Sequence, residues 1–224
     1  MQFSKQLVKA IIFDLDGTLI DSDKDIEKII NLIRKNDLNK KKLPIKKIAN
    51  YTSIGGDDLI KKTISEKNYK FHLQTFRKLY LKLEIRKKLI LPGVINFLKF
   101  LKSKNIKIYI CTNKPKSLCS KIINNTRLKE FIDMYFCSDE YKVKKPNSKF
   151  FLKIQQKIKI NKNQKKFIGD SIIDYNFCQN SILKFFLFKN SRIEYPKKIY
   201  FKLSKLDRIL FNYKNMNRFK RIIL

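Results

Sequence analysis

An apolar run that ends in two closely spaced carboxylates constrains this chain more than any other feature. The run is Ala10 to Phe13, and Asp14 and Asp16 follow it in the stretch IIFDLDGTLI. Consecutive apolar residues without polar alternation are typical of a strand that is buried on both faces. Gly17 lets the turn after the strand close. Because ligands bind at the carboxyl ends of strands in open α/β sheets, the two carboxylates are candidates for a nucleophile and an acid or base.

Strand and helix patterns alternate in the second half of the chain. We expect strands at residues 107–111, 134–137, 166–168 and 184–188, separated by helices at 116–125, 148–160 and 172–180. A further strand at 199–201, a short helix near Leu206 and a basic tail from Asn212 follow. Strands that alternate with helices predict a parallel sheet with helices on both faces, which is a Rossmann-like α/β fold.

The segment between the first two predicted strands is helical in pattern. Ser22 is a plausible N-cap, and apolar residues then recur at the spacing of one helix face: Ile26, Ile29, Ile30 and Ile33. Helical periodicity continues to Lys88, and Pro92 and Gly93 mark its end. We therefore expect two domains: an α/β core of residues 1–20 and 91–224, and a helical domain of residues 21–90 inserted after the first strand.

Polar motifs also follow later strands. Thr112 and Asn113 come after the strand at 107–111, where a hydroxyl and a helix N-terminus can bind a phosphoryl oxygen. Lys145 precedes a helix and can place its ammonium against the same group. Asp170 and Asp174 follow the strand at 166–168, and their carboxylates suit a hard cation. Each motif alone is ordinary, since lysines are mostly on surfaces and Gly-Asp-Ser often only caps a helix.

Taken together and in order, these motifs resemble the signatures of the haloacid dehalogenase superfamily of phosphohydrolases, whose first signature stands here complete as D-L-D-G-T at residues 14–18. The resemblance implies that Asp14 attacks phosphorus and becomes an aspartyl-phosphate. Asp16 would protonate the leaving alkoxide and then activate the hydrolytic water. Thr112 and Lys145 would bind the transferring phosphoryl group, and thus serve both catalysis and substrate binding.

The same resemblance implies a Mg²⁺ cofactor. The ion would be held by the carboxylates of Asp14 and Asp170 and by the backbone carbonyl of Asp16, with waters completing an octahedron. Asp174 would orient Lys145 or a metal-bound water. These assignments predict that side chains from four separate strand ends converge on one pocket.

The helical insert resembles the superfamily's cap, which closes over the site and excludes water. Gly55 and Gly56, in the loop 53–58, would contact substrate from this cap, and Asn113 would contact it from the core. A plain turn followed by an N-cap is the alternative interpretation of that loop.

Within the capped members, the motifs T-N-K-P at 112–115, K-K-P at 144–146 and F-I-G-D-S at 167–171 most resemble the phosphoglycolate phosphatases. This resemblance implies hydrolysis of 2-phosphoglycolate to glycolate and phosphate. One alternative is a capped phosphatase for another small phosphate, such as a sugar phosphate or a nucleoside monophosphate, because specificity lies in the cap. The other is a nucleic-acid-binding protein on the same fold.

The formal net charge of +33, from 52 Lys and Arg against 19 Asp and Glu, raises the question of a polyanionic partner. The lysines are scattered through every segment, alongside abundant Asn, Ile, Phe and Tyr. Adenine- and thymine-rich codons specify these residues, so compositional drift accounts for the charge. We see no nucleic-acid-binding module and expect a small phosphorylated substrate instead of a nucleic acid.

The cysteines indicate a reducing compartment. Cys111, Cys119, Cys137 and Cys178 show no C-x-x-C pairing and no nearby histidine, so neither a zinc site nor a disulfide framework is expected. Asp14 interrupts the N-terminal apolar run far short of a signal peptide or a membrane span. We therefore expect a cytoplasmic protein without a membrane partner; the sequence leaves its oligomeric state open.

Overall fold

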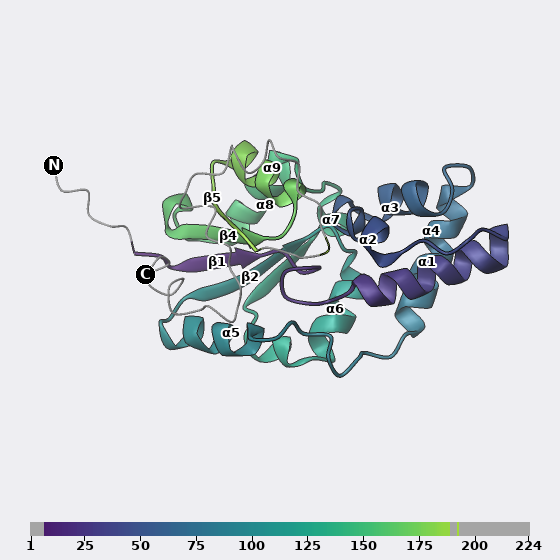
Figure 1. Cartoon of the computed structure of the whole chain (residues 1–224). Coiled ribbons are helices and arrows are strands. Elements are labelled where there is room, and N and C mark those ends of the chain that lie inside the picture. Colours follow the sequence, from purple (N-terminus) through teal and green to yellow (C-terminus); the bar gives the residue numbers. More distant parts are fainter. Residues whose placement is uncertain (1–6, 189–191, 193–224) are drawn as a thin grey trace.

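The computed structural model describes residues 7–188 and Arg192, and these residues contain a five-stranded sheet (Figure 1). Its strands are β1 (Ala10–Phe13), β2 (Lys107–Thr112), β3 (Met134–Cys137), β4 (Lys165–Gly169) and β5 (Lys184–Leu187). The strand order is β3-β2-β1-β4-β5, and every neighbouring pair is parallel. The predicted Rossmann-like sheet is therefore confirmed, with β1 at its centre.

The side chains of β1 alternate between two hydrophobic clusters, one on each face of the sheet. Ile11 and Phe13 belong to one cluster, and Ala10 and Ile12 belong to the other. All four residues are fully buried, because successive side chains of a strand point to opposite faces and both faces are covered. This explains why the run is apolar without alternation.

Helices cover both faces of the sheet (Figure 1). α5 (Val94–Ser103) and α6 (Lys116–Asn124) contribute to the cluster that contains Phe13. α8 (Ser148–Lys157) and α9 (Ile172–Ser181) contribute to the opposite cluster. The short elements are α7 (Ser138–Tyr141) and the 3₁₀ turns η2 (Arg127–Glu130) and η3 (Lys162–Gln164).

A helical insertion, which we define as the segment between β1 and β2 that carries α1 to α4, extends from one end of the sheet (Figure 1). Its elements are α1 (Asp23–Leu38), α2 (Ile45–Ala49), the 3₁₀ turn η1 (Thr52–Ile54), α3 (Gly56–Thr63) and α4 (Tyr69–Lys82). The predicted face of α1 is confirmed, since its four isoleucines are all buried. The insertion's two connections to the core run side by side, with a bridge between Ile20 and Ile90.

Apart from strand and helix ends that shift by one residue, two details differ from the sequence prediction. Ser22 occupies the N-cap position of α1, but its hydroxyl makes no capping hydrogen bond. Its backbone is already helical, at φ −84° and ψ −13°, whereas a capping side chain needs extended backbone to reach the first free N–H groups. The helix predicted to reach residue 160 ends at Lys157. The strand expected at 199–201, the helix near Leu206 and the tail lie outside the described residues.

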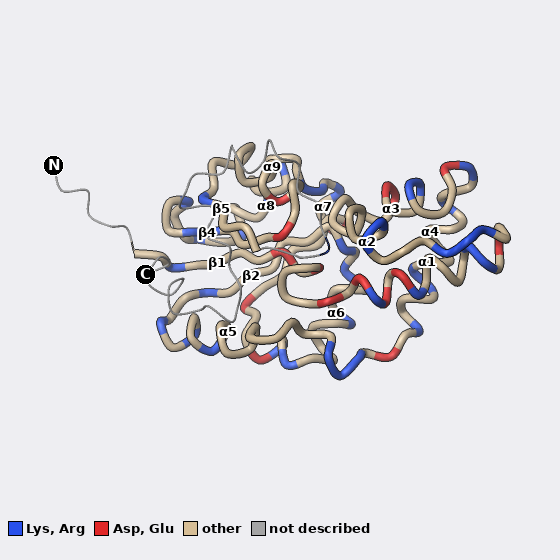
Figure 2. The backbone as a smooth tube through the Cα atoms, viewed as in Figure 1, with Lys and Arg blue, Asp and Glu red and all other residues tan. Residues whose placement is uncertain are grey.

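The basic residues are spread over many elements of the structure, as they are spread along the sequence. Figure 2 shows Lys and Arg on the helices around the sheet and on those of the helical insertion, and not on one element alone. Within residues 7–188, none of the helices has the length and apolar composition that crossing a bilayer would require.

Candidate active site

The turn after β1 buries both of the first two carboxylates. The backbone N–H of Asp14 donates to the carbonyl of Ile168 at 2.9 Å, which ties the strand end to β4. Gly17 has a φ of +78°, and its N–H donates to the carbonyl of Ile20 at 2.9 Å. Glycine suits this position because it adopts positive φ without the steric cost that a side chain would bring. Asp14 and Asp16 keep only 3% and 6% of their surface exposed.

Lys145 connects two of the predicted site residues. Its Nζ lies 2.7 Å from Oδ1 of Asp14 and 2.6 Å from Oδ1 of Asp174, and the lysine side chain is 2% exposed. Burial alone would lower the pKa of Lys145, but the two carboxylates outweigh burial and raise it. Burial and the nearby Asp174 raise the pKa of Asp14 to about 7, although Lys145 opposes the shift. The ammonium of Lys145 is therefore a fixed positive charge in the pocket.

Asp174 is held by the start of α9. Its Oδ2 accepts hydrogen bonds from the hydroxyl and the backbone N–H of Ser171, at 2.5 and 3.2 Å, in a capping box. A Cβ on Gly169 would lie only 2.6 Å from the Asp174 side chain, so glycine is needed there for close packing. Both oxygens of Asp174 are thus occupied, one by Ser171 and the other by Lys145.

Three carboxylates meet at this point. Oxygens of Asp14, Asp170 and Asp174 lie within 4.8 Å of one another, and all three residues are buried. Thr18 donates a hydrogen bond to Oδ1 of Asp170 at 3.4 Å. Grouped carboxylate oxygens suit a hard cation such as Mg²⁺. The side chain of Asp16 is not in this group.

Thr112 is the last residue of β2, one residue beyond the predicted strand end, and Asn113 follows it. Oγ1 of Thr112, which is 1% exposed, accepts a hydrogen bond from the backbone N–H of Lys114 at 3.1 Å. Nδ2 of Asn113 donates to the carbonyls of Lys145 and Ser53, both at 3.1 Å, and its Oδ1 accepts from the N–H of Lys145 at 2.8 Å. The amide of Asn113 therefore contacts protein backbone on both sides; its contact with substrate stays a prediction.

Lys114 is a site residue that the sequence analysis passed over. Its Nζ lies 3.1 Å from Oδ1 of Asp16 and 4.5 Å from the centre of the Tyr80 ring on α4. Burial would lower its pKa, but Asp16 and Tyr80 raise it. The sequence feature that could have identified Lys114 is its position two residues after Thr112, at a strand end. Lysines are so frequent in this chain that this position alone did not distinguish it.

Gly55 and Gly56 lie at the boundary between the helical insertion and the core. They line one small cavity of about 40 Å³ together with Asp16 and Lys114 from the core and Arg77 from α4. Gly55 has a φ of +100°, and a Cβ on Gly56 would lie 2.9 Å from Leu73. We call this space the boundary cavity. The predicted glycine loop and the acidic turn thus face the same space.

Two core residues, Lys144 and Asn113, make polar contacts with the helical insertion beside this cavity. Nζ of Lys144 lies 2.7 Å from Oδ2 of Asp58 on α3, and it also donates to the carbonyl of Ile54 at 3.3 Å. Asn113 donates a hydrogen bond to the carbonyl of Ser53. The helical insertion therefore touches the core next to Lys145 and Asn113.

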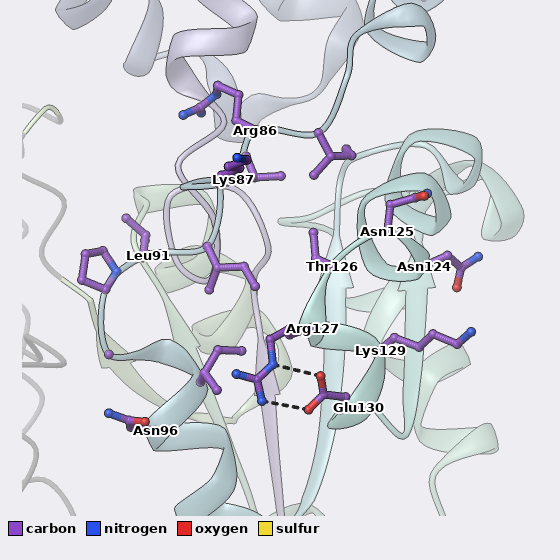
Figure 3. Close-up of a pocket in the computed structure, with 16 residues that line it drawn as sticks. Arg86, Lys87, Leu91, Asn96, Asn124, Asn125, Thr126, Arg127, Lys129 and Glu130 are labelled. Atoms are coloured by element: carbon purple, nitrogen blue, oxygen red, sulfur yellow. Dashed lines mark hydrogen bonds and ion pairs between the residues drawn. The ribbon is translucent and has the colours of Figure 1, made fainter.

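A larger hollow, of about 1100 Å³, has no residue in common with the site. It lies between residues 85–96 and residues 124–130, and the Arg127–Glu130 ion pair forms part of its wall (Figure 3). Its polar side chains include Asn96, Asn124 and Lys129 (Figure 3).

Residues 11–188 match the family of haloacid dehalogenase-like hydrolases. The phosphoglycolate phosphatase of Psychrobacter arcticus is 30% identical over 182 residues, which cover 76% of this chain and 79% of that protein. The phosphoglycolate phosphatase of Aquifex aeolicus is 29% identical over 167 residues, with 75% and 78% covered. The crystal structure of a putative phosphoglycolate phosphatase from Lactobacillus delbrueckii has the same fold, with a TM-score of 0.82, 16% identity and coverage of 98% of this chain and 99% of that chain.

Proposed function

The chain belongs to the haloacid dehalogenase-like hydrolase family and is a phosphatase, and from this premise we propose that it hydrolyses 2-phosphoglycolate through an aspartyl-phosphate on Asp14. The observation that carries the proposal is the convergence of Asp14, Lys145 and Asp174 on one buried cluster. Relatives that share most of this chain's length support the choice of substrate.

The first step needs a nucleophile and a cation at the transferring phosphoryl group. Asp14 attacks phosphorus, and the Lys145 ammonium stabilises the negative charge on the phosphoryl oxygens. Thr112 donates a second hydrogen bond from the end of β2. Hydrolysis of phosphate monoesters is among the slowest uncatalysed reactions, so this preorganised charge supplies a large part of the acceleration.

Asp16 is the general acid and base in this mechanism. It protonates the leaving alkoxide and then takes a proton from the water that hydrolyses the aspartyl-phosphate. Its place beside the boundary cavity, on the side of the helical insertion, supports this role because the leaving group would extend in that direction. Lys114 holds the Asp16 carboxylate in position.

We propose that Mg²⁺ is bound by the carboxylates of Asp14 and Asp170 and by the backbone carbonyl of Asp16. The group of buried carboxylate oxygens fits this ion. Asp174 acts differently, because Lys145 and Ser171 occupy both of its oxygens, and it orients Lys145. When bound, the ion supplies positive charge that favours the ionised form of Asp14 and offsets charge on the phosphoryl group.

We also propose a division into a core of residues 1–20 and 91–224 and a cap of residues 21–90 that closes over the site. The contacts of Asp58 and Ser53 with the core support closure at this boundary. Gly55 and Gly56 then border the leaving group. A cytoplasmic location is supported by the four cysteines, all of which are free.

Turnover of a panel of phosphate esters with and without Mg²⁺ tests the proposal. The panel contains 2-phosphoglycolate, several sugar phosphates and several nucleoside monophosphates. We expect Mg²⁺-dependent release of phosphate that is fastest from 2-phosphoglycolate. A better sugar phosphate or nucleoside monophosphate would establish the alternative capped phosphatase, and 2-phosphoglycolate among the poorest substrates would refute our choice.

A further inference from the structure

The boundary cavity contains two cations in different electrostatic situations. Lys114 is neutralised by Asp16, at 3.1 Å. Arg77 lines the same cavity from α4, and its Nη2 would lie 3.9 Å from a Cβ built on Gly56. In the described part of the chain, Arg77 takes part in no ion pair or hydrogen bond. Arg77, a half-buried residue, therefore borders the cavity without a hydrogen-bond partner among the described residues.

A guanidinium at the wall of a small cavity can bind an anion that enters the cavity. It offers a planar fork of N–H donors that pairs with a carboxylate through two parallel hydrogen bonds. Asp16, which supplies the carboxylate in the cavity wall, is already paired with Lys114. The partner that fits Arg77 is thus a group that the substrate brings in.

We propose that Arg77 binds a carboxylate on the leaving group of the substrate and thereby selects phosphate esters of small 2-hydroxy acids. This inference rests on the proposed function, because it assumes that the ester is cleaved at Asp14. It adds a specificity-determining residue on the helical insertion to the catalytic residues of the core.

The size of the cavity distinguishes a carboxylate from a second phosphate. A cavity needs roughly 10 to 15 Å³ of accessible volume for each water molecule. The boundary cavity of about 40 Å³ therefore holds about three non-hydrogen atoms. A carboxylate has three such atoms and a phosphate has five, so the carboxylate is the better match to this volume.

The test compares 2-phosphoglycolate with its amide, which has the same shape and no charge on the leaving group. The wild-type protein, Arg77→Gln, Arg77→Lys and the control Lys78→Gln are assayed with both esters and Mg²⁺. Lys78 is exposed on the same helix, so its variant removes one charge of the same sign. The readout is the ratio of the two kcat/KM values, which cancels any loss common to both esters.

We expect the wild type to prefer the acid by about 10- to 100-fold, the value of a charged hydrogen bond. Arg77→Gln should reduce this preference to within about threefold, mainly through KM for the acid, because the contact forms in ground state and transition state alike. Arg77→Lys should retain part of the preference, and Lys78→Gln all of it. Equal losses on both esters in Arg77→Gln, or an unchanged preference, would overturn the inference.

A binding measurement separates this inference from the proposed function. Calorimetry with the Asp14→Asn protein, and with the same protein carrying Arg77→Gln, gives the affinities for the acid and the amide without turnover. If the wild type hydrolyses esters but neither turnover nor binding favours the acid, the inference is wrong and the phosphatase assignment stands. If no ester is hydrolysed, the proposed function fails, and an Arg77-dependent preference in binding still decides the role of Arg77.

Discussion

The side-chain amide of Asn113 forms hydrogen bonds with both the backbone N–H and the backbone carbonyl of Lys145. Oδ1 accepts from the N–H of Lys145 at 2.8 Å, and Nδ2 donates to the carbonyl of the same residue at 3.1 Å. Asn113, the residue directly after β2, thereby fixes the backbone position of Lys145, 32 residues further along the chain, and so the placement of its ammonium.

Asn113→Ala should therefore damage catalysis through Lys145. We expect kcat to fall roughly 10²-fold, because a displacement of about 1 Å in a catalytic group has that effect. The free energy of unfolding should drop by about 1–3 kcal/mol, since two buried backbone groups lose their partners. Steady-state kinetics and urea denaturation measure both. The control, Asn124→Ala, removes an exposed asparagine; similar losses in this variant would contradict the assignment.

Asp14→Asn should abolish turnover and leave the fold intact. The amide has the shape of the carboxylate but cannot attack phosphorus, so we expect a loss on the order of 10³-fold or more. Phosphate release and the thermal unfolding midpoint are measured on the same preparation. Residual hydrolysis near the wild-type rate would remove Asp14 from the nucleophile role.

Asp16→Asn should trap the aspartyl-phosphate when the leaving group needs no proton. Acetate leaves acetyl phosphate without protonation, whereas hydrolysis of the intermediate still requires a base. We expect acid-quenched Asp16→Asn protein to retain close to one equivalent of ³²P from labelled acetyl phosphate. The double variant with Asp14→Asn should retain none. Label of equal amount in both proteins would place the phosphorylated residue elsewhere.

Asp58→Asn should weaken closure of the helical insertion. The ion pair with Lys144 is 2.7 Å long but about half exposed, so it contributes about 0.2–1 kcal/mol. We expect KM to rise by about two- to fivefold at low salt, and this difference to vanish at about 1 M salt, where surface charges are screened. Asp57→Asn, on the same turn, is the control. A rise in KM that persists at high salt would point to a cause other than this ion pair.

Asp133→Asn should give a stability loss that depends on pH. The carboxylate accepts from Nζ of Lys102 at 2.6 Å, from Nζ of Lys107 at 3.0 Å and from the N–H of Ile108 at 2.9 Å. Burial opposes the shift, but these bonds prevail and lower the pKa of Asp133 below 3.8. The contribution of the Asp133 carboxylate to the free energy of unfolding is therefore complete above pH 3.8. It is lost as the pH falls through the lower pKa that this group has in the folded state.

Urea denaturation across the pH range tests this expectation. The free energy of unfolding of Asp133→Asn should lie about 1 kcal/mol below that of the wild type at neutral pH. The values for the two proteins should converge below pH 3.8. A deficit that stays constant in acid would assign it to packing instead of charge.

Local pattern was enough to predict the five strands of the described chain and the helices α1, α6, α8 and α9. Four apolar residues before Asp14 indicated a buried strand, and the spacing of the isoleucines after Ser22 indicated an amphipathic helix. These predictions hold because side-chain periodicity follows directly from helix and strand geometry. Ser22 shows the limit, since a hydroxyl caps a helix only if its backbone is extended, and neighbouring contacts set that backbone.

The sequence by itself determined that Asp14, Thr112 and Asp170 stand at strand ends and that Lys145 precedes a helix, because the order of these motifs can be read without coordinates. Only the tertiary structure decided what Lys114, Asn113 and Arg77 contact. Lys114 is one of many lysines in the sequence, and packing against Tyr80 and Asp16 distinguishes it from those at the surface. Such contacts join residues far apart in the chain, and no local periodicity encodes them.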